Sequence, residues 1–277
     1  MNRRNIVLTG TGRSGTTLAC HLLNKLPNTV ALSEPIPPGK FVEYMPDHEA
    51  ICDQVENYYR KTRTRARKKG IAISKHVGGV VPDNTKGMVD GVRRRIAEKG
   101  KIDIKKELHQ GFYLAIKQPQ LFTVLLPTLK KRIPCYAIVR NPLAVRASMS
   151  SIASREDRRI SAIDRYDPEL ARRFRSVEDD TERALLRFHT WFELYLRELP
   201  AKHILRYEDI VASGGGALSV IVPAARDLDE ALENKNTNPI YDKSKVLEFG
   251  QRLLESDGAY WRLYSRDSVR EIMDALS

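Results

Sequence analysis

The sequence predicts an α/β fold in which a P-loop-like parallel β-sheet is flanked by helices on both faces, as a three-layer sandwich. The chain opens with a short apolar run, a glycine-containing loop and a helical pattern, all within residues 5–26. Further short apolar runs alternate with amphipathic stretches, and such alternation favours parallel strands joined by right-handed helical crossovers. Because 42% of the 277 residues are hydrophobic, we expect a sizeable core, and a wholly disordered chain is excluded.

The first part of the chain supplies two predicted strands and two predicted helices. Residues 6–8 are an apolar run that ends in Thr-Gly-Thr-Gly, which is typical of a buried strand entering a tight loop. Apolar residues then recur at helical spacing up to Leu26, where Pro27 stops the pattern. Residues 29–33 predict a second strand, residues 43–69 a helix with a basic end, and the glycine- and proline-punctuated residues 77–91 a loop.

The rest of the chain continues this alternation. Short apolar runs predict strands at 112–116, 133–139 and 203–206, and helical patterns predict helices at 121–129, from 142 to about 151 and at 181–199. The charged segment 155–180 is expected to be an irregular, mobile insertion. After a flexible break at 213–216, two amphipathic segments close the chain, so residues 214–277 are expected to be a helical C-terminal part. No repeat or linker divides the chain, and we expect one domain over residues 1–277.

The formal net charge of +12 favours anionic partners, such as nucleotides, sulfated sugars, nucleic acid or a membrane surface. The three cysteines, Cys20, Cys52 and Cys135, form no CxxC pair and no disulfide framework, which fits a reducing compartment. The N-terminal apolar run is too short for the core of a signal peptide, and no stretch is long and apolar enough to span a bilayer. A cytoplasmic protein without a transmembrane segment is therefore expected.

The loop after the first predicted strand has the composition of a phosphate-binding loop. Backbone N–H groups and the positive end of the following helix dipole can bind phosphate oxygens, and the glycines allow positive φ and a close approach of the backbone. The residues expected to hold the anion are Gly12, Arg13, Ser14, Gly15, Thr16 and Thr17.

The same loop differs from the P-loop of nucleoside triphosphatases, G-x-x-x-x-G-K-[ST]. The glycine spacing is right, but Thr16 stands where that loop has lysine, and the cation has moved to Arg13. The predicted strand at 133–139 is followed by Arg140, whereas a Walker-type magnesium site needs an aspartate at a strand end. Arginine in both places argues against metal-assisted phosphoryl transfer, so no metal is expected.

Three segments resemble motifs of the PAPS-dependent sulfotransferases, where PAPS is 3′-phosphoadenosine 5′-phosphosulfate. Arg13-Ser14-Gly15-Thr16-Thr17 matches their 5′-phosphosulfate loop, (K/R)-x-G-T-T. Arg140-Asn141-Pro142 with Ser148 matches their second signature, a strand-end arginine followed by N-P or D-P and, eight positions after the arginine, by a serine. Arg206-Tyr207-Glu208-Asp209 is similar to their "RYEDL" segment after a late strand. The three matches occur in the family's order over residues 5–210.

The resemblance, which extends to bacterial and carbohydrate-type members, implies a sulfotransferase-type sandwich with PAPS as co-substrate. In the family the second-signature arginine and serine hold the 3′-phosphate, so Arg140 and Ser148 are expected there, with Tyr207 beside the nucleotide. The implied reaction is metal-independent, in-line sulfuryl transfer to an acceptor hydroxyl or amine. Acceptors in the family are diverse, and a carbohydrate, a lipid or another small molecule stays open.

Arg13, Glu34 and Lys117 are the predicted catalytic residues. Arg13 is placed to stabilise charge that develops on the sulfuryl and bridging oxygens. Glu34 follows the strand at 29–33, at the carboxyl edge where α/β sheets bind ligands, and some carbohydrate-type and bacterial members carry a similar Glu-Pro with the glutamate proposed as base. Cytosolic small-molecule members instead use a histidine after the third core strand, which is absent from Lys117-Gln118-Pro119. Lys117 is expected to contact the sulfuryl group or the leaving-group oxygen.

Residues 60–69 form a strongly basic run. No nucleic-acid-binding motif accompanies it, so no nucleic-acid partner is expected. The run is interpreted as a solvated helix face or as a surface for an anionic acceptor, in which Arg63, Arg65 and Arg67 would act on acceptor binding. Near the C-terminus, Lys243 and Lys245 are weaker candidates for a contact with the 3′-phosphate.

Other functions stay open at this point. A P-loop kinase acting on a small molecule is the main rival enzyme, although the Walker lysine and the metal-holding aspartate are missing at the expected places. A nucleotide-binding protein without catalysis and a basic nucleic-acid-binding protein are the alternatives from other classes. The sequence also leaves a homodimer open.

Overall fold

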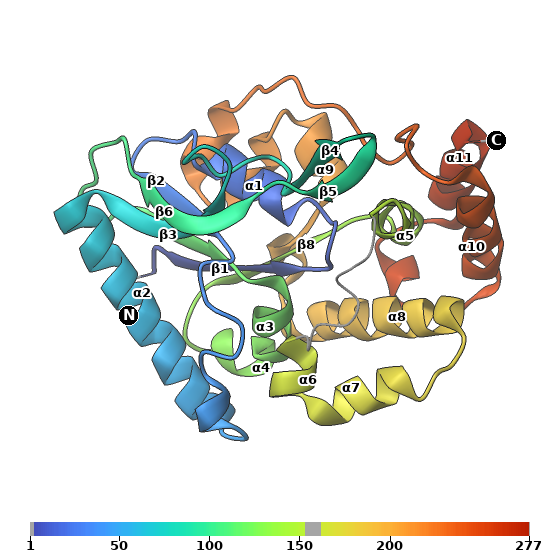
Figure 1. The fold of residues 1–277 in the computed structure, drawn as a ribbon, viewed down its shortest axis with the longest axis horizontal. Helices are drawn as coiled ribbons and strands as arrows, with labels where there is room; N and C mark the ends of the chain where they lie inside the picture. The colour runs from blue at the N-terminus through green and yellow to red at the C-terminus, as the bar shows by residue number, and fades with distance from the viewer. Residues whose placement is uncertain (1–2, 153–161, 277) are drawn as a thin grey trace.

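The computed structural model describes residues 3–152 and 162–276 and has an α/β fold built on a five-stranded parallel sheet (Figure 1). The strand order is β2-β7-β1-β8-β9, and each neighbouring pair is parallel. The strands are β1 (Asn5–Gly10), β2 (Thr29–Ser33), β7 (Tyr113–Lys117), β8 (Cys135–Val139) and β9 (Ile204–Arg206). The predicted α/β class and parallel sheet are confirmed.

The strands appear in the sequence as short apolar runs because helices cover both faces of the sheet and bury them. Every residue of β1, β2 and β8 is buried. Figure 1 shows helices both above and below the sheet. Those above are α1 (Thr16–Leu23) and α9 (Tyr207–Ala212), and those below are α3 (Pro119–Val124), α4 (Leu126–Leu129) and α8 (Asp180–Glu198).

The central strand β1 is the point at which the order of the strands reverses. From β1 the chain builds β2 and β7 on one side of the sheet, and it then crosses to build β8 and β9 on the other side. The loops after β1 and β8 therefore leave the same carboxyl edge next to each other. In open α/β sheets ligands bind at such a switch point, and the motifs that contain Arg13 and Arg140 both begin here.

Two small antiparallel sheets lie beside the main one, and the sequence analysis did not predict them. β3 (Ile71–His76) pairs with β6 (Glu98–Asp103), and β4 (Lys86–Val89) pairs with β5 (Val92–Arg95). The predicted loop over residues 77–91 is thus wrong at its end, because β4 begins there. The long predicted helix is α2 (His48–Lys69), which starts later than expected because the Asp47 side chain caps it by accepting from the Ala50 N–H. A single turn, η1 (Val42–Tyr44), precedes it.

Part of the predicted insertion, residues 155–161, lies outside the described residues. The described part is not irregular, because it forms α6 (Ala162–Tyr166) and α7 (Pro168–Arg175). Phe174 on α7 is buried and meets the Trp191 ring edge-on, with centroids 5.7 Å apart. Arginines on the solvent face of α7 mask this short apolar stripe in the sequence. That the insertion moves stays a prediction.

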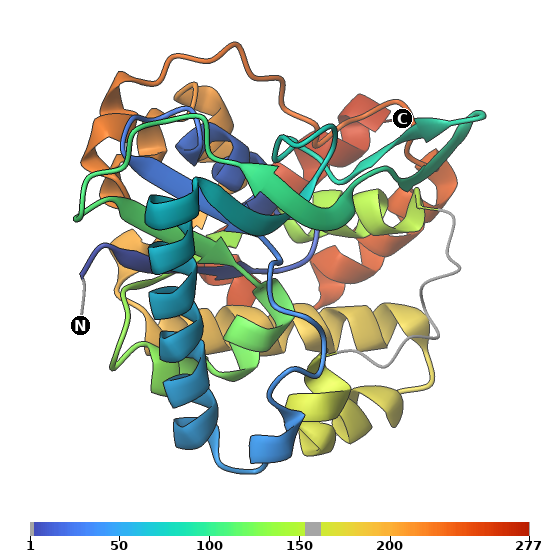
Figure 2. The ribbon, with the colours of Figure 1, turned by 60° about the vertical axis from the view of Figure 1, so that its left-hand side comes forward.

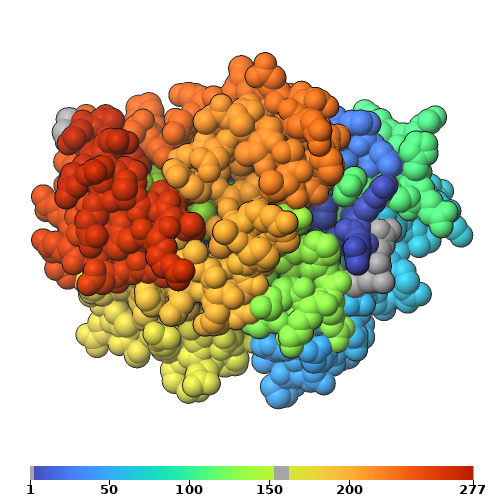
Figure 3. Space-filling view, turned by 180° about the vertical axis from the view of Figure 1, so that it is seen from behind, coloured from blue at the N-terminus to red at the C-terminus, as the bar shows by residue number. Residues whose placement is uncertain are grey.

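The C-terminal part contains helices separated by a long loop and packs against the rest of the chain. Seen from behind, it forms a continuous surface with the central residues (Figure 3). Its longer helices are α10 (Lys243–Glu255) and α11 (Arg266–Leu276), and α10 packs on α5 (Pro142–Ser150). Short turns η2 (Ala201–His203), η3 (Gly216–Val220), η4 (Pro223–Asp227) and η5 (Ala259–Arg262) complete the described elements. Across residues 3–152 and 162–276, no helix has both the length and the apolar character needed to cross a membrane.

Candidate active site

The loop after β1 takes its shape from two residues with a left-handed backbone. Arg13 has φ 68° and Gly15 has φ 88°, and a Cβ atom on Gly15 would lie 2.6 Å from Cδ2 of Tyr207. Only glycine fits there. Ser14 is fully buried, and its hydroxyl lies 2.7 Å from the Thr11 carbonyl oxygen and 2.6 Å from the Ile138 carbonyl oxygen. The Ser14 side chain is therefore committed to holding the loop against β8.

The loop leads directly into the start of α1, which has no side-chain cap. The first N–H groups of a helix have no partner within the helix and carry its positive dipole end. In this chain they belong to Thr16 and Thr17, next to the Gly15 N–H. Gly12 precedes them and packs near Met149, where an added Cβ would lie 3.3 Å from Cε. The loop thus offers backbone donors rather than serine or threonine hydroxyls as its main anion contacts.

Arg13, Ser148 and Arg140 lie together, although they come from two separate motifs. Arg13 Nε donates to Ser148 Oγ at 3.0 Å, and Arg13 Nη2 donates to Asn84 Oδ1 at 3.3 Å. Arg140 Nη1 donates to the Arg13 carbonyl oxygen at 3.1 Å. Within the described residues, no carboxylate forms an ion pair with either arginine, and the buried Nη2 atom of Arg140 has no hydrogen-bond partner. An unpaired buried guanidinium nitrogen costs free energy, which an anion would recover.

A third arginine, Arg93 on β5, reaches the same place from outside the main sheet. Its Nη1 atom donates to the Ser151 hydroxyl at 2.8 Å, and its side chain also contacts the Tyr241 hydroxyl. Burial, together with the neighbouring charges of Arg93 and Arg140, lowers the pKa of Arg13 to about 10. We call Arg13, Arg93 and Arg140 the arginine cluster. Its members repel one another, and an anion bound between them would relieve the repulsion.

Aromatic and amide side chains orient Arg140 within the cluster. Its guanidinium lies over the Tyr207 ring, 4.4 Å from the centroid, and its Nε donates to Asn236 Oδ1 at 2.8 Å. Asn236 in turn donates to Glu208 Oε1 at 3.0 Å, and the Tyr264 hydroxyl donates to Glu208 Oε2 at 2.8 Å. Tyr207 and Glu208, from the third motif, thus support the arginine of the second. Arg140 is 4% exposed, so this support also fixes its direction.

A hollow of about 290 Å³ lies beside this network, and Asn236, Glu208 and Arg206 help to line it. None of its lining residues belongs to the glycine loop, and neither Glu34 nor Lys117 contributes. The hollow is therefore separate from the arginine cluster, although Asn236 both lines the hollow and accepts a hydrogen bond from Arg140.

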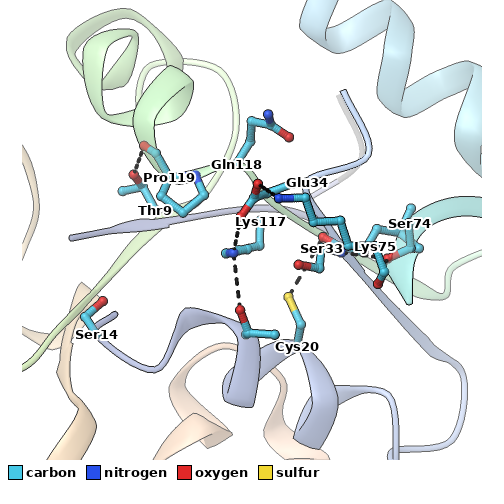
Figure 4. Close-up of polar contacts among 12 residues, drawn as sticks. Thr9, Ser14, Cys20, Ser33, Glu34, Ser74, Lys75, Lys117, Gln118 and Pro119 are labelled. Atoms are coloured by element: carbon cyan, nitrogen blue, oxygen red, sulfur yellow. Dashed lines mark hydrogen bonds and ion pairs between the residues drawn. The ribbon is translucent and has the colours of Figure 1, made fainter. Parts of the chain in front are cut away.

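Glu34 lies between two lysines at the carboxyl ends of β2 and β7 (Figure 4). Lys117 Nζ donates to Glu34 Oε1 at 2.6 Å, and Lys75 on β3 forms an ion pair with Oε2. Lys117 Nζ also lies 3.3 Å from Thr17 Oγ1, which connects this pair to the start of α1. Burial alone would raise the pKa of Glu34, but Lys117 and Lys75 outweigh it and hold that pKa well below its usual range. Glu34 is therefore an ionised carboxylate in the free protein.

This pairing limits what Glu34 can do as a base. A carboxylate that is stabilised by two ammonium groups is a weak proton acceptor, because protonation would break both ion pairs. Lys117 is 4% exposed and has Thr17 Oγ1 as its other neighbour, so a small movement towards the loop would leave Glu34 more basic. Lys117 therefore lies between Glu34 and the start of α1.

The structure brings most of the predicted site residues together and reveals others that the sequence did not indicate. Arg93 on β5 and Lys75 on β3 come from strands that were not predicted, and Asn84 comes from the predicted loop before β4. Near the C-terminus the cluster is reached by Asn236 and Tyr241 rather than by Lys245, which is exposed and pairs with Asp242 at 3.2 Å. The signal for the hairpin that carries Arg93 was present in the sequence, as Asp-Gly between two short runs with strand-forming valines.

The basic run on α2 lies at the opposite edge of the sheet. Arg63 donates to the Phe112 carbonyl oxygen at 2.7 Å and to Asn5 Oδ1 at 2.7 Å. Asn5 begins β1 and Phe112 precedes β7, so these contacts are at the amino edge, whereas Glu34 and Arg140 follow strand ends. These contacts tie α2 to the amino edge of the sheet, and an effect of Arg63, Arg65 and Arg67 on acceptor binding stays a prediction.

Fold and site together define an α/β protein with a five-stranded parallel sheet, an arginine cluster at the switch point and a Lys–Glu–Lys group beside it. A scan against protein-family models and a search of curated proteins find no match.

Proposed function

We propose that the protein is a sulfotransferase that transfers the sulfuryl group of PAPS to the hydroxyl or amine of an acceptor, on a sulfotransferase-type variant of the α/β sandwich. The observation that carries the proposal is the pair of contacts from Arg13 to Ser148 and from Arg140 to the Arg13 carbonyl oxygen. These contacts join two segments that are far apart in the chain, and each segment resembles a different motif of the family.

The donor fits the charges of the site. PAPS carries a 5′-phosphosulfate and a 3′-phosphate, and the site offers the loop N–H groups at the start of α1 together with the arginine cluster beside them. The unpartnered Nη2 of Arg140 is the group that the 3′-phosphate would satisfy, and Ser148, which Arg13 contacts, is the second proposed ligand of that phosphate. Tyr207 would form a wall of the site, since its ring already packs against both Gly15 and Arg140.

Residues of the chain can carry each part of the transfer. The acceptor oxygen or nitrogen forms a bond to sulfur while the bond from sulfur to the 5′-phosphate oxygen breaks, and adenosine 3′,5′-bisphosphate leaves. Arg13 and the loop N–H groups stabilise the charge on the sulfuryl and leaving oxygens. Lys117 moves from Glu34 towards the leaving oxygen, and Glu34, freed from one ion pair, accepts the acceptor's proton. The acceptor stays open among a carbohydrate, a lipid and another small molecule.

Calorimetric titration with adenosine 3′,5′-bisphosphate and, separately, with ATP–Mg²⁺ tests the donor class. Tight binding of the bisphosphate and none of ATP–Mg²⁺ supports the proposal, whereas the reverse supports a P-loop kinase. Transfer of label from ³⁵S-labelled PAPS to a panel of acceptors then separates an enzyme from a nucleotide-binding protein without catalysis.

A further inference from the structure

Large hydrophobic side chains are exposed around the β4–β5 hairpin. Among the described residues nine such side chains are exposed, and five of them lie between residues 77 and 96. They are Val77, Val80, Met88, Val89 and Ile96. Single exposed hydrophobic residues are ordinary on protein surfaces, but a local group of this kind marks an interaction surface.

The geometry of the hairpin keeps these side chains outside the core. The turn at Asp90 and Gly91, both with positive φ, projects from the body of the protein in Figures 1 and 2. Ile96 folds back over β4, where a Cβ atom on Gly87 would lie 2.9 Å from Ile96 Cδ1. Val89 is two residues after Gly87 and so lies on the same face of the strand as Ile96. Met88 is on the other face and is 58% exposed.

Basic residues flank this apolar tip. Residues 86–95 contain four basic side chains and one acidic side chain. Arg94 is exposed and lies opposite Gly87 in the register, so it shares the face of Val89 and Ile96. The hairpin therefore combines an apolar tip with a cationic base, and we call Met88, Val89, Ile96 and Arg94 the hairpin surface.

We propose that the hairpin surface docks on an anionic membrane, with its apolar side chains entering the boundary between headgroups and acyl chains. Two four-residue strands offer too little area for a stable protein–protein interface, which buries about 800 Å² per partner. Membrane docking needs only a few apolar side chains and nearby cations, and each cation raises the binding constant roughly fivefold. Because Arg93 on the same hairpin belongs to the arginine cluster, docking would hold the site near the lipid surface.

Sedimentation of the full chain with vesicles tests this proposal without any assumption about sulfuryl transfer. We expect binding to vesicles of phosphatidylcholine mixed with phosphatidylserine, little binding to phosphatidylcholine alone, and weaker binding as salt is raised. Replacing the two tip residues, Met88→Asp with Val89→Asp, should abolish sedimentation. Arg94→Ser, which leaves the tip intact, should weaken it roughly fivefold. Val220→Asp is the matched control, because Val220 is 46% exposed on η3, and it should sediment like the unchanged chain.

An unchanged thermal midpoint shows that each variant is folded. If the Met88→Asp, Val89→Asp double variant is not folded, the sedimentation of Arg94→Ser with vesicles is the test. No preference for anionic vesicles, or equal sedimentation of the tip variant, would overturn the proposal. Analytical ultracentrifugation adds one further arm. A dimer that is lost on Met88→Asp, together with no vesicle binding, would instead assign the hairpin surface to a second copy of the chain.

Discussion

Arg13 Nε lies 3.0 Å from Ser148 Oγ, although 135 residues separate the two in the chain. The contact joins the loop after β1 to the helix after β8, the two elements that meet at the switch point of the sheet. Arg140 completes the arrangement through the Arg13 carbonyl oxygen. The two arginines therefore meet at one place in the fold, as the binding of a single nucleotide by both would require.

Arg93→Ala should weaken binding of adenosine 3′,5′-bisphosphate by roughly tenfold or more, because a hydrogen bond to a charged group contributes about 1.5–3 kcal/mol. Isothermal titration calorimetry measures the change. Arg67→Ala is the matched control, since Arg67 is exposed on α2. If the two variants bind the nucleotide equally well, Arg93 does not belong to the nucleotide site.

Gly15→Ala should destabilise the protein more than Gly91→Ala. Both glycines have positive φ, 88° and 72°, so both alanines carry the backbone cost of about 1 kcal/mol. Only at Gly15 does the new Cβ atom also meet a side chain, Tyr207 Cδ2 at 2.6 Å, whereas at Gly91 nothing lies within 4 Å. Denaturant unfolding measures the free energy of unfolding of both variants. Equal decreases would show that the Tyr207 side chain can move away from the new Cβ atom at little cost.

Glu34→Gln should lower kcat by about 10²–10⁴-fold, the usual contribution of a general base, while bisphosphate affinity stays within a few fold. The substitution keeps the size of the side chain but removes the proton acceptor. The thermal midpoint must be recorded alongside, because Lys75 and Lys117 lose their partner. A variant that is folded and fully active would place the base elsewhere.

Lys75→Met should raise the pKa of Glu34 towards the ordinary value of about 4.3, because one of its two ion pairs is removed. The sign for stability follows from the lowered pKa in the folded state. The ion pairs stabilise the fold above the ordinary carboxyl pKa, and this contribution is lost as the pH falls through the lowered folded-state pKa. NMR titration of the Glu34 carboxyl carbon measures the pKa directly, and an unchanged value would mean that Lys117 alone sets it.

The main sheet was predictable because its strands are buried on both faces and therefore appear as apolar runs. β3 and β6 were missed for a physical reason: β6 contains Gly100 and three charged residues among its first four, and it becomes a strand only through antiparallel pairing with β3. Helix α7 was missed because Ala171 and Phe174 form an apolar stripe too short to stand out among the arginines. Tertiary contacts, rather than local pattern, decide these segments.

Site residues could be predicted where they belong to a recognisable sequence motif, as Arg13 and Arg140 do. Lys75 and Arg93 reach the site from strands that pair outside the main sheet, so no spacing along the chain connects them to a motif. The low pKa of Glu34 was likewise hidden, because it depends on Lys117 and Lys75, which are 83 and 41 residues away in the chain. Sequence alone also could not separate Arg63, which ties α2 to Asn5 and Phe112, from a ligand-binding arginine.

The central claim, that Arg13 and Arg140 bind the two phosphate ends of one nucleotide, is tested most directly by comparing adenosine 3′,5′-bisphosphate with adenosine 5′-monophosphate. Titration calorimetry on the unchanged chain and on Arg140→Ala gives four affinities. The account predicts that the unchanged chain prefers the bisphosphate and that Arg140→Ala removes most of this preference while leaving the monophosphate nearly unaffected. Equal weakening of both nucleotides, or no preference in the unchanged chain, would contradict it.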